Sequence, residues 1–504
     1  MNRRTTFKSL VLLTTGSLLQ PAKIFSREST LWKSRLSRHF LSTRIDPELP
    51  EEKRLPFGWQ GFSVAGERPA LLRPTLPVNL QAGDGLLLRC SVAIDVREEK
   101  VVRARIAGTQ EELGHFDIRY AAVFQVFDLE IAPLFLPAIN QHGIELSLER
   151  GENPMWFFAA TPGYRDRDNT FLPQLLAYPK DEIDREEAFI RQMCSLNSIQ
   201  PFGWMEGCVL DGLYQMYKRK KHRKARRAIK GHFARFFDRQ DNFIHEDPRS
   251  RPLDNKIGTI ESTQPFSTLA RLEPDHPVFT EVLKFWEERT QPDGTVTDHY
   301  SVTAEGSYTI AYPMAVIGKQ RGDKAMMEKA YAQILLRKTM LVQDGDIYLR
   351  YYPKDDSRKY RNWARGVTWY LLGMVRTMAA LHDQLDVSEA AEEVARVAKM
   401  VIPHQLKNGL WPCFIHEADI APDNSGSAGI AAALATAVHN GWIGQEYLPF
   451  CRKTYTTLLD QLTPDGLLQG VAQSNKVGEA LQRSDYRVTS QMGLGLMAQL
   501  YAAL

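Results

Sequence analysis

Two patterns of apolar and polar residues divide the chain. From about residue 55 to 160, apolar and polar positions alternate in short runs, such as Leu86 to Ile94, with turn residues between them. Alternation places successive side chains on opposite faces of a strand, so residues 55–162 are predicted to form a β-sandwich. From about residue 163 to 504 the apolar residues recur at helical spacing, which predicts a mainly α-helical domain.

The helical part contains a repeat. About twelve segments with helical spacing begin near residues 183, 205, 222, 258, 276, 305, 323, 361, 387, 424, 446 and 487. Alternate members recur every fifty to sixty residues or so, a period typical of one supersecondary unit repeated around a shared core. Six helical hairpins of this kind predict an (α/α)6 barrel.

A turn followed by a short strand comes after five of the expected outer helices. The copies begin at Asp241, Asp293, Asp344, Asn408 and Asp465. Most carry Asp-Gly or Asn-Gly, which favour the left-handed conformations that open hairpins. Each copy is expected to deliver side chains to the same rim of the barrel, where binding residues of repeated scaffolds collect. Those side chains include His245, His299, Arg350 and His416.

The N-terminus has the layout of an export signal. Arg3, Arg4 and Lys8 precede an apolar stretch from Leu10 to Leu19, so residues 1–26 are predicted to be a signal peptide and 27–54 a linker. The mature protein is expected in the periplasm or outside the cell. No other run approaches membrane-spanning length, so no stable membrane insertion is expected.

The net charge and the cysteines give little information about fold or function. The net charge is +3, with one basic block from Lys218 to Arg227. We interpret that block as a solvated turn between helices rather than a docking site for a polyanionic glycan or nucleic acid, since no aromatic residues interleave it. The 5 cysteines are scattered without paired spacing, which favours core thiols over disulfides or zinc. The oligomeric state is left open.

The most informative motif is Trp363-Ala364-Arg365-Gly366-Val367-Thr368-Trp369, which opens a long apolar helix. Arg365 and Trp369 are four residues apart and therefore point from one face, a cation beside an indole. By spacing alone, a helix-end salt bridge packed on a core aromatic is the more ordinary interpretation. The motif resembles the unsaturated glucuronyl and rhamnogalacturonyl hydrolases, glycoside hydrolase families 88 and 105, whose matching Arg and Trp hold the uronic acid of the substrate.

The resemblance extends from about Gly203 to the C-terminus. It includes the run from Asp423 to Gly429 and the closing Gly493-Leu494-Gly495 helix. It also includes Trp204-Met205-Glu206, which is similar to the first inner helix of those families. The resemblance therefore implies that Trp204 and Glu206 contact the sugar.

Two departures from the family pattern bear on mechanism. Where those hydrolases place their catalytic Asp, this chain reads Tyr308-Thr309-Ile310-Ala311-Tyr312, without a carboxylate, and Arg350 stands where a His normally follows the Asp-Gly strand. Glycoside hydrolysis requires one carboxylic acid and one carboxylate. Glu305 and Glu261, at the expected entrances of two adjacent inner helices, are the predicted pair.

The environment expected around these glutamates follows from the barrel. Trp369, Tyr308 and Trp204 would desolvate Glu305, raise its pKa and suit it to act as an acid. Glu206 and Asp298 are held in reserve. The alternative interpretation is that either glutamate is only a helix-terminal charge favoured by the helix dipole.

These observations predict an exo-acting glycoside hydrolase that removes a terminal uronic acid, with glucuronic acid expected, from an acidic oligosaccharide. Such acid/base hydrolysis needs no cofactor, and the rim histidines are expected to bind sugar hydroxyls rather than a metal. The enzyme would resemble the β-glucuronidases of family 154. The alternatives are the unsaturated uronyl hydrolysis of families 88 and 105 on polysaccharide-lyase products, and a barrel that binds glycans without cleaving them.

Overall fold

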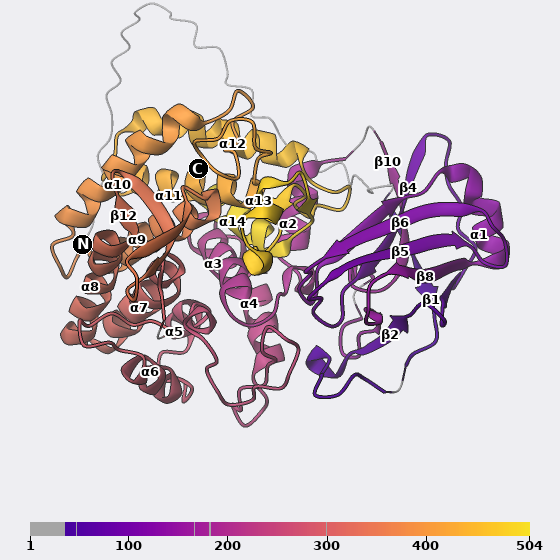
Figure 1. Ribbon diagram of the computed structural model, residues 1–504, viewed down its shortest axis with the longest axis horizontal. Coiled ribbons are helices and arrows are strands. Elements are labelled where there is room, and N and C mark those ends of the chain that lie inside the picture. Colours follow the sequence, from indigo (N-terminus) through magenta and orange to yellow (C-terminus); the bar gives the residue numbers. More distant parts are fainter. Residues whose placement is uncertain (1–35, 47, 166, 181–182, 299) are drawn as a thin grey trace, which may run out of the picture. The chain divides into compact units, whose positions relative to one another are not determined.

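The computed structural model describes residues 36–46, 48–165, 167–180, 183–298 and 300–504 (Figure 1). The predicted signal peptide, residues 1–26, lies outside the described residues. Residues Leu36–Leu504 form one compact unit that contains both a β-rich part and a helical part.

Ten strands and one helix make up the N-terminal β-rich part. They are β1 Ser37–Ser42, β2 Gln60–Val64, β3 Ala70–Pro74, β4 Asp84–Ser91, β5 Glu99–Ile106, β6 Glu112–Arg119, β7 Val126–Glu130, α1 Leu136–His142, β8 Ile144–Arg150, β9 Met155–Ala160 and β10 Gln174–Pro179. Alternating residues of β5 are buried and half-buried, as the sequence pattern predicts for a strand with one face in the core.

The strand order differs from that of two separate sheets. Eight strands follow the continuous order β6-β5-β8-β3-β1-β10-β4-β7, and β2 pairs with β9. Strand β1 joins the two halves because its first four residues pair with β10 and its last two with β3. The β-rich part also extends beyond residues 55–162, since β1 lies in the stretch expected to be a linker and β10 follows it.

Every predicted helical segment contains a helix. The helices are α2 Arg185–Met193, α3 Trp204–Arg219, α4 Arg223–Phe236, α5 Phe266–Leu272, α6 Phe279–Glu288, α7 Tyr312–Arg321, α8 Lys324–Leu341, α9 Ala364–Leu381, α10 Ser388–Val401, α11 Asn424–His439, α12 Leu448–Asp460, α13 Glu479–Arg483 and α14 Gln491–Ala503. The 3-10 turn η4 (Ile260–Thr263) precedes α5, and the π-helical turn η5 (Ser307–Ala311) precedes α7.

Six of these helices close a ring. Helices α3, α5, α7, α9, α11 and α14 contact one another in that order, and α14 packs back against α3. They are buried on nearly all sides, for example along α9 and α11, whereas the partner helices α4 and α10 are amphipathic. The ring of inner helices surrounded by outer ones is the predicted (α/α)6 barrel.

The repeated turns form the predicted hairpins. Short antiparallel bridges join Phe237 to Phe243, Thr290 to Val296, and Leu462 to Leu468 across them. In the third copy, β12 (Val342–Gln343) pairs with β13 (Asp346–Tyr352), which also pairs with β11 (Val302–Thr303) and β14 (Ser357–Arg361). Two further short strands, β15 (Val471–Ala472) and β16 (Arg487–Val488), pair near the last inner helix.

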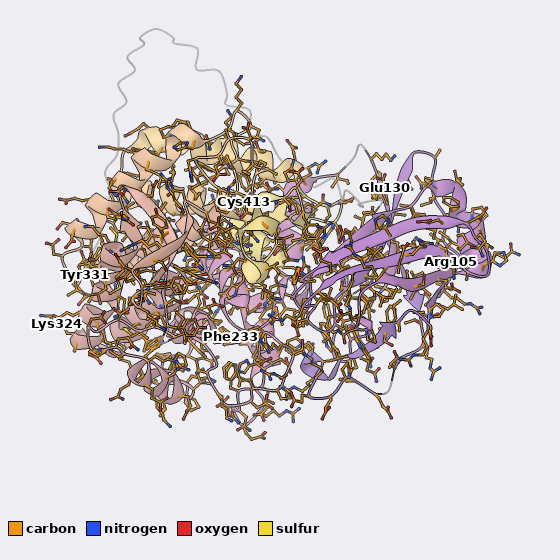
Figure 2. The ribbon with its side chains drawn as sticks, in the orientation of Figure 1. Arg105, Glu130, Phe233, Lys324, Tyr331 and Cys413 are labelled. Carbon is orange, nitrogen blue, oxygen red and sulfur yellow. The ribbon has the colours of Figure 1, made fainter. Side chains whose placement is uncertain are left out.

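A buried ionic cluster joins the β-rich part to the barrel. Asp465, at the fifth turn, is fully buried and accepts hydrogen bonds from Arg89 of β4 and Arg38 of β1 at 2.5 Å each. These charges hold the pKa of Asp465 well below its usual range. Elsewhere side chains fill the space between the elements (Figure 2), in one large core centred on the barrel and a second one within the sheet.

The cysteines behave as core thiols. Cys90, Cys208, Cys413 and Cys451 are buried, Cys194 is half-buried, and all are free. Among the described residues, we find no helix that is both long and apolar enough to cross a bilayer.

Candidate active site

A cavity of about 200 Å³ opens where the inner helices begin. Five of the residues singled out from the sequence line it: Trp204, Glu261, Glu305, Arg365 and Trp369. Trp204 is the first residue of α3, Glu261 lies in η4, Glu305 precedes η5, and Arg365 and Trp369 lie in the first turns of α9. The barrel therefore brings together residues that are up to 165 positions apart in the chain.

The hairpin at the third turn positions Glu305. Strand β11 pairs with β13 so that Thr303 lies opposite Arg350, and Ala304 donates a hydrogen bond to Leu349. Glu305 follows directly; it is only 7% exposed, and its Oε2 has no hydrogen-bond partner among the described residues. Burial raises the pKa of Glu305, and the neighbouring cations Arg350 and then Arg365 oppose this rise.

Glu261 is the second carboxyl group of the cavity. It lies in η4, whose first residue, Ile260, donates its N–H to Asp298 at 3.2 Å. Burial, and then repulsion from Glu305 and Asp298, raise the pKa of Glu261 to about 8, against the opposing effect of Arg350. At neutral pH Glu261 therefore retains its proton, which gives the cavity one carboxylic acid next to a second carboxyl group.

A buried arginine supports the backbone before Glu305. Arg337 of α8 donates to the carbonyls of Thr303 at 3.1 Å and Val296 at 2.6 Å. Its guanidinium packs on Gly306, where a Cβ atom would lie only 2.1 Å from Nη2. The glycine after Glu305 is therefore required for this close approach.

Arg365 reaches the cavity as predicted from the motif, but its two terminal nitrogens are already bonded to the protein. Its Nη1 and Nη2 donate to the main-chain carbonyls of Ala472 and Gln473 at 2.8 and 2.7 Å, because the segment that includes β15 passes next to the start of α9. The Nε atom is buried without a partner among the described residues. The guanidinium also lies 4.8 Å from the ring centroid of Trp363. Arg365 therefore brings positive charge to the cavity lining, and its Nε hydrogen has no partner among the described residues.

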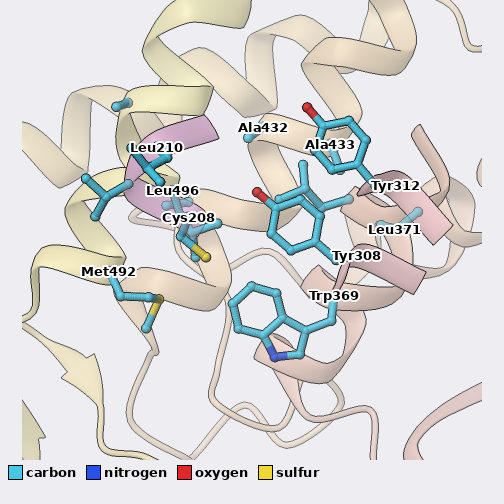
Figure 3. Packing of buried hydrophobic residues seen from close by; sticks show 14 of the residues in the cluster. Cys208, Leu210, Tyr308, Tyr312, Trp369, Leu371, Ala432, Ala433, Met492 and Leu496 are labelled. Carbon is cyan, nitrogen blue, oxygen red and sulfur yellow. The ribbon is translucent and has the colours of Figure 1, made fainter. Parts of the chain in front are cut away.

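Aromatic rings form one wall. The Trp369 ring meets that of Trp204 edge to face at 5.5 Å, and it stacks on Tyr308 at 6.0 Å. Figure 3 shows Trp369 beside Tyr308, with Tyr312 beyond them. Rings of this kind present apolar faces suited to the C–H face of a sugar.

The structure places two of the predicted site residues, Tyr308 and Glu206, away from the cavity lining. The Tyr308 hydroxyl donates to Asp211 at 2.9 Å and accepts from Gln499, so Tyr308 belongs to a polar network inside the barrel and does not line the cavity. Glu206 is fully buried, where it pairs with His232 at 2.7 Å and accepts a hydrogen bond from the Gln200 amide. Both side chains are therefore bonded to other groups of the barrel.

The remaining predicted residues lie around the site. Arg350 is close enough to Glu305 and Glu261 to affect the pKa of both, although it does not line the cavity itself. His416 also lies off the cavity, with Nε2 at 3.6 Å from Glu417. His299 lies outside the described residues. Within the described parts of the chain, no group of three or more His, Cys, Asp or Glu residues is arranged to hold a metal ion.

The β-rich part supplies a wall that the sequence did not reveal. The cavity is also lined by residues that come from its loops: Arg54, Pro56, Asp95, Arg97, Ala122, Val123 and Phe124. Arg54 falls in the stretch predicted to be a linker and the others in the region predicted to form a β-sandwich, and no motif marks any of them. Ser474, Asn475 and Lys476, which follow β15, were missed for the same reason.

Comparisons with known proteins agree with this architecture. Residues 182–503 match the family model described as Glycosyl Hydrolase Family 88. The fold is similar to solved structures described as possible GH105 family members from Salmonella enterica serovar Paratyphi A (17% identity, TM-score 0.54) and Klebsiella pneumoniae (18% identity, TM-score 0.53). Each similarity covers 68% of this chain and 98% of the other. A search of curated proteins finds no match.

Proposed function

The chain belongs to glycosyl hydrolase family 88 and is a glycoside hydrolase, and we propose that it removes a terminal uronic acid, glucuronic acid in the first place, from acidic oligosaccharides. One observation supports this proposal above all others: Glu261 and Glu305 lie at one cavity, both with raised pKa values, beside Arg350 and Arg365. Paired carboxyl groups whose protonation states differ are the requirement of glycoside hydrolysis.

The environments of the two glutamates suggest their roles. Glu261, whose pKa of about 8 keeps it protonated at neutral pH, donates its proton to the leaving glycosidic oxygen. Glu305, which the two arginines favour in its ionised form, acts as the base for water or as the nucleophile. This assignment reverses the expectation from the sequence, in which Glu305 was the acid.

The cations and aromatic rings suggest how the sugar is held. A uronic acid brings a carboxylate into the cavity, and a buried guanidinium binds a carboxylate more strongly than it binds a neutral hydroxyl. Arg365 offers its Nε hydrogen for this contact, and Arg350 adds charge. Trp204 and Trp369 provide ring faces for the apolar side of the pyranose.

The test compares two substrate classes. Purified protein is assayed on saturated aryl β-glucuronides and on unsaturated disaccharides produced by a polysaccharide lyase, each with the wild type and with Glu261→Gln and Glu305→Gln. We expect turnover of the saturated uronide and a loss of about 100-fold or more in each variant, the range for removing a general acid or base. Turnover confined to the unsaturated sugar would contradict the proposal.

The unsaturated uronyl hydrolase reaction is a second candidate. Family membership favours it, and a protonated Glu261 could supply the proton that hydration of an enol ether also requires. In that case the same two variants lose activity on the unsaturated disaccharide. Calorimetric binding of uronides without any product would instead indicate a barrel that only binds glycans.

A further inference from the structure

A loop of the β-rich part enters the cavity wall. We call residues Tyr120 to Gln125, between β6 and β7, the wall loop; its residues Ala122, Val123 and Phe124 line the same cavity as Glu261 and Glu305. Phe124 is 1% exposed and is fixed by rings on several sides, including Trp59 and Phe158. Ala122, by contrast, is half-buried and in reach of a ligand.

The wall loop has a constrained backbone at both ends. Tyr120 has φ 51° and Phe124 has φ 69°, in the left-handed region that residues with a side chain adopt only at a cost. Such conformations persist where the surrounding structure holds them, and they collect at binding and catalytic sites. The conformation of this loop is therefore enforced from outside.

The barrel supplies several of the groups that hold the wall loop. Gln491 of α14 donates to the Phe124 carbonyl at 3.0 Å, and Gln473 donates to the Arg119 carbonyl at 2.8 Å and to the Gln125 side chain at 3.2 Å. The Tyr486 hydroxyl accepts from the Arg119 amide at 3.1 Å. These partners come from the last part of the barrel, whereas Val92 and Val96 hold the loop from its own β-rich part through main-chain hydrogen bonds. The loop is therefore fixed between the β-rich part and the barrel.

The same barrel segment connects the wall loop to the catalytic residues. The main-chain carbonyl of Gln473 accepts a hydrogen bond from Arg365. The charge of Arg365 in turn opposes the rise in the pKa of Glu305. Gln473 therefore bonds both to the wall loop and to Arg365, and so connects the loop to the arginine beside Glu305. The three residues of the wall loop that line the cavity are apolar, unlike Glu261, Glu305 and Arg365 on the barrel side.

We propose that the wall loop of the N-terminal β-rich part forms the subsite for the group released from the uronic acid, with Ala122 and Val123 packing against the apolar face of a sugar or aryl ring. This proposal rests on the proposed function. It gives the β-rich part a direct role in choosing the substrate: the size and shape of the leaving group are limited by a surface that the barrel alone does not provide.

The test fills the subsite with an indole. Ala122→Trp is assayed against aryl β-glucuronide and methyl β-glucuronide, which differ in whether a ring occupies the subsite. We expect kcat/KM for the aryl substrate to fall at least about tenfold relative to the methyl substrate, mainly through KM, because steric exclusion removes ground-state binding. Gln110→Trp, on the exposed turn between β5 and β6, is the matched control and should leave the ratio unchanged.

The outcomes separate this inference from the proposed function. Equal losses on both substrates, or none, overturn the wall-loop subsite, and thermal unfolding of Ala122→Trp shows whether an equal loss reflects a damaged fold. If the wild type cleaves no saturated uronide, the proposed function fails instead. The loop is then tested by calorimetry with a uronic acid monosaccharide and a disaccharide, where Ala122→Trp should weaken only the disaccharide by about tenfold or more.

Discussion

Replacing Glu261 by Gln should inactivate the enzyme and stabilise it at the same time. In the folded protein the pKa of Glu261 is raised from 4.5 to about 8. Below about pH 4.5 the side chain is protonated in both the folded and the unfolded chain, so it contributes no pH dependence there. As the pH rises from 4.5 to 8, the unfolded chain releases the proton and the native state holds it, so the folded state loses stability.

The size of this effect follows from the shift. The 3.5 units between 4.5 and about 8 correspond to about 5 kcal/mol at about 1.4 kcal/mol per unit. Glu261 is partly exposed, and solvent screening reduces the net effect. We therefore expect Glu261→Gln to be more stable than the wild type by about 1–3 kcal/mol at pH 8.5, and equal to it at pH 4.5.

The measurement is the free energy of unfolding in urea at both pH values, together with kcat/KM on an aryl β-glucuronide. The glutamine should lower kcat/KM by about 100- to 10,000-fold, the range of a lost general acid. Glu281→Gln, at an exposed glutamate of α6, is the control and should change neither quantity. A stability difference that is the same at pH 4.5 and pH 8.5 would refute the reasoning, because it could not arise from a shifted pKa.

Three further predictions concern neighbouring groups. Arg350→Met removes the main cation that opposes the raised pKa of Glu305, so the acidic limb of the profile of kcat/KM against pH should move to higher pH. An unchanged limb would show that Arg350 does not influence the pKa of Glu305. Tyr308→Phe should lower the free energy of unfolding in urea by about 1–3 kcal/mol because Asp211 and Gln499 lose a partner, and kcat/KM should change less than about threefold. A fall of about 100-fold in kcat/KM of the folded variant would show that Tyr308 takes part in catalysis. Asp465→Asn removes the buried carboxylate that Arg38 and Arg89 share, although Arg89 keeps Asp128, and should lower the unfolding free energy by about 3–5 kcal/mol; a change under about 1 kcal/mol would show that this cluster contributes little to stability.

Local pattern was a good guide to the catalytic part of the fold. The spacing of apolar residues located most helices to within a few residues, whereas α5 and α7 begin later than predicted because the turns η4 and η5 precede them. The Asp-Gly and Asn-Gly turns located the hairpins between the helices. The family resemblance placed Arg365 and Trp369 at the site, and the carboxylates at the same end of the repeat predicted Glu261 and Glu305 as the catalytic pair. All four line one cavity.

Other features depend on what each side chain meets across the fold. Glu206 and Tyr308 have the right residue types at the right ends of inner helices, yet His232 and Asp211 bind them inside the barrel. The terminal nitrogens of Arg365 are occupied by carbonyls more than 100 residues away in the chain. No local pattern encodes such a partner, because it is defined only after the ring has closed.

The sequence by itself determined the periodic part of this protein: a helical barrel, a β-rich part before it, and a rim where carboxylates, arginines and tryptophans could meet. Only the tertiary structure showed which predicted residues share one cavity, which have partners elsewhere in the barrel, and that a loop of the β-rich part lines the cavity. The physical reason is that apolar periodicity is a property of neighbouring residues. A pKa, a satisfied hydrogen bond and a cavity wall each depend on groups that folding brings together from distant parts of the chain.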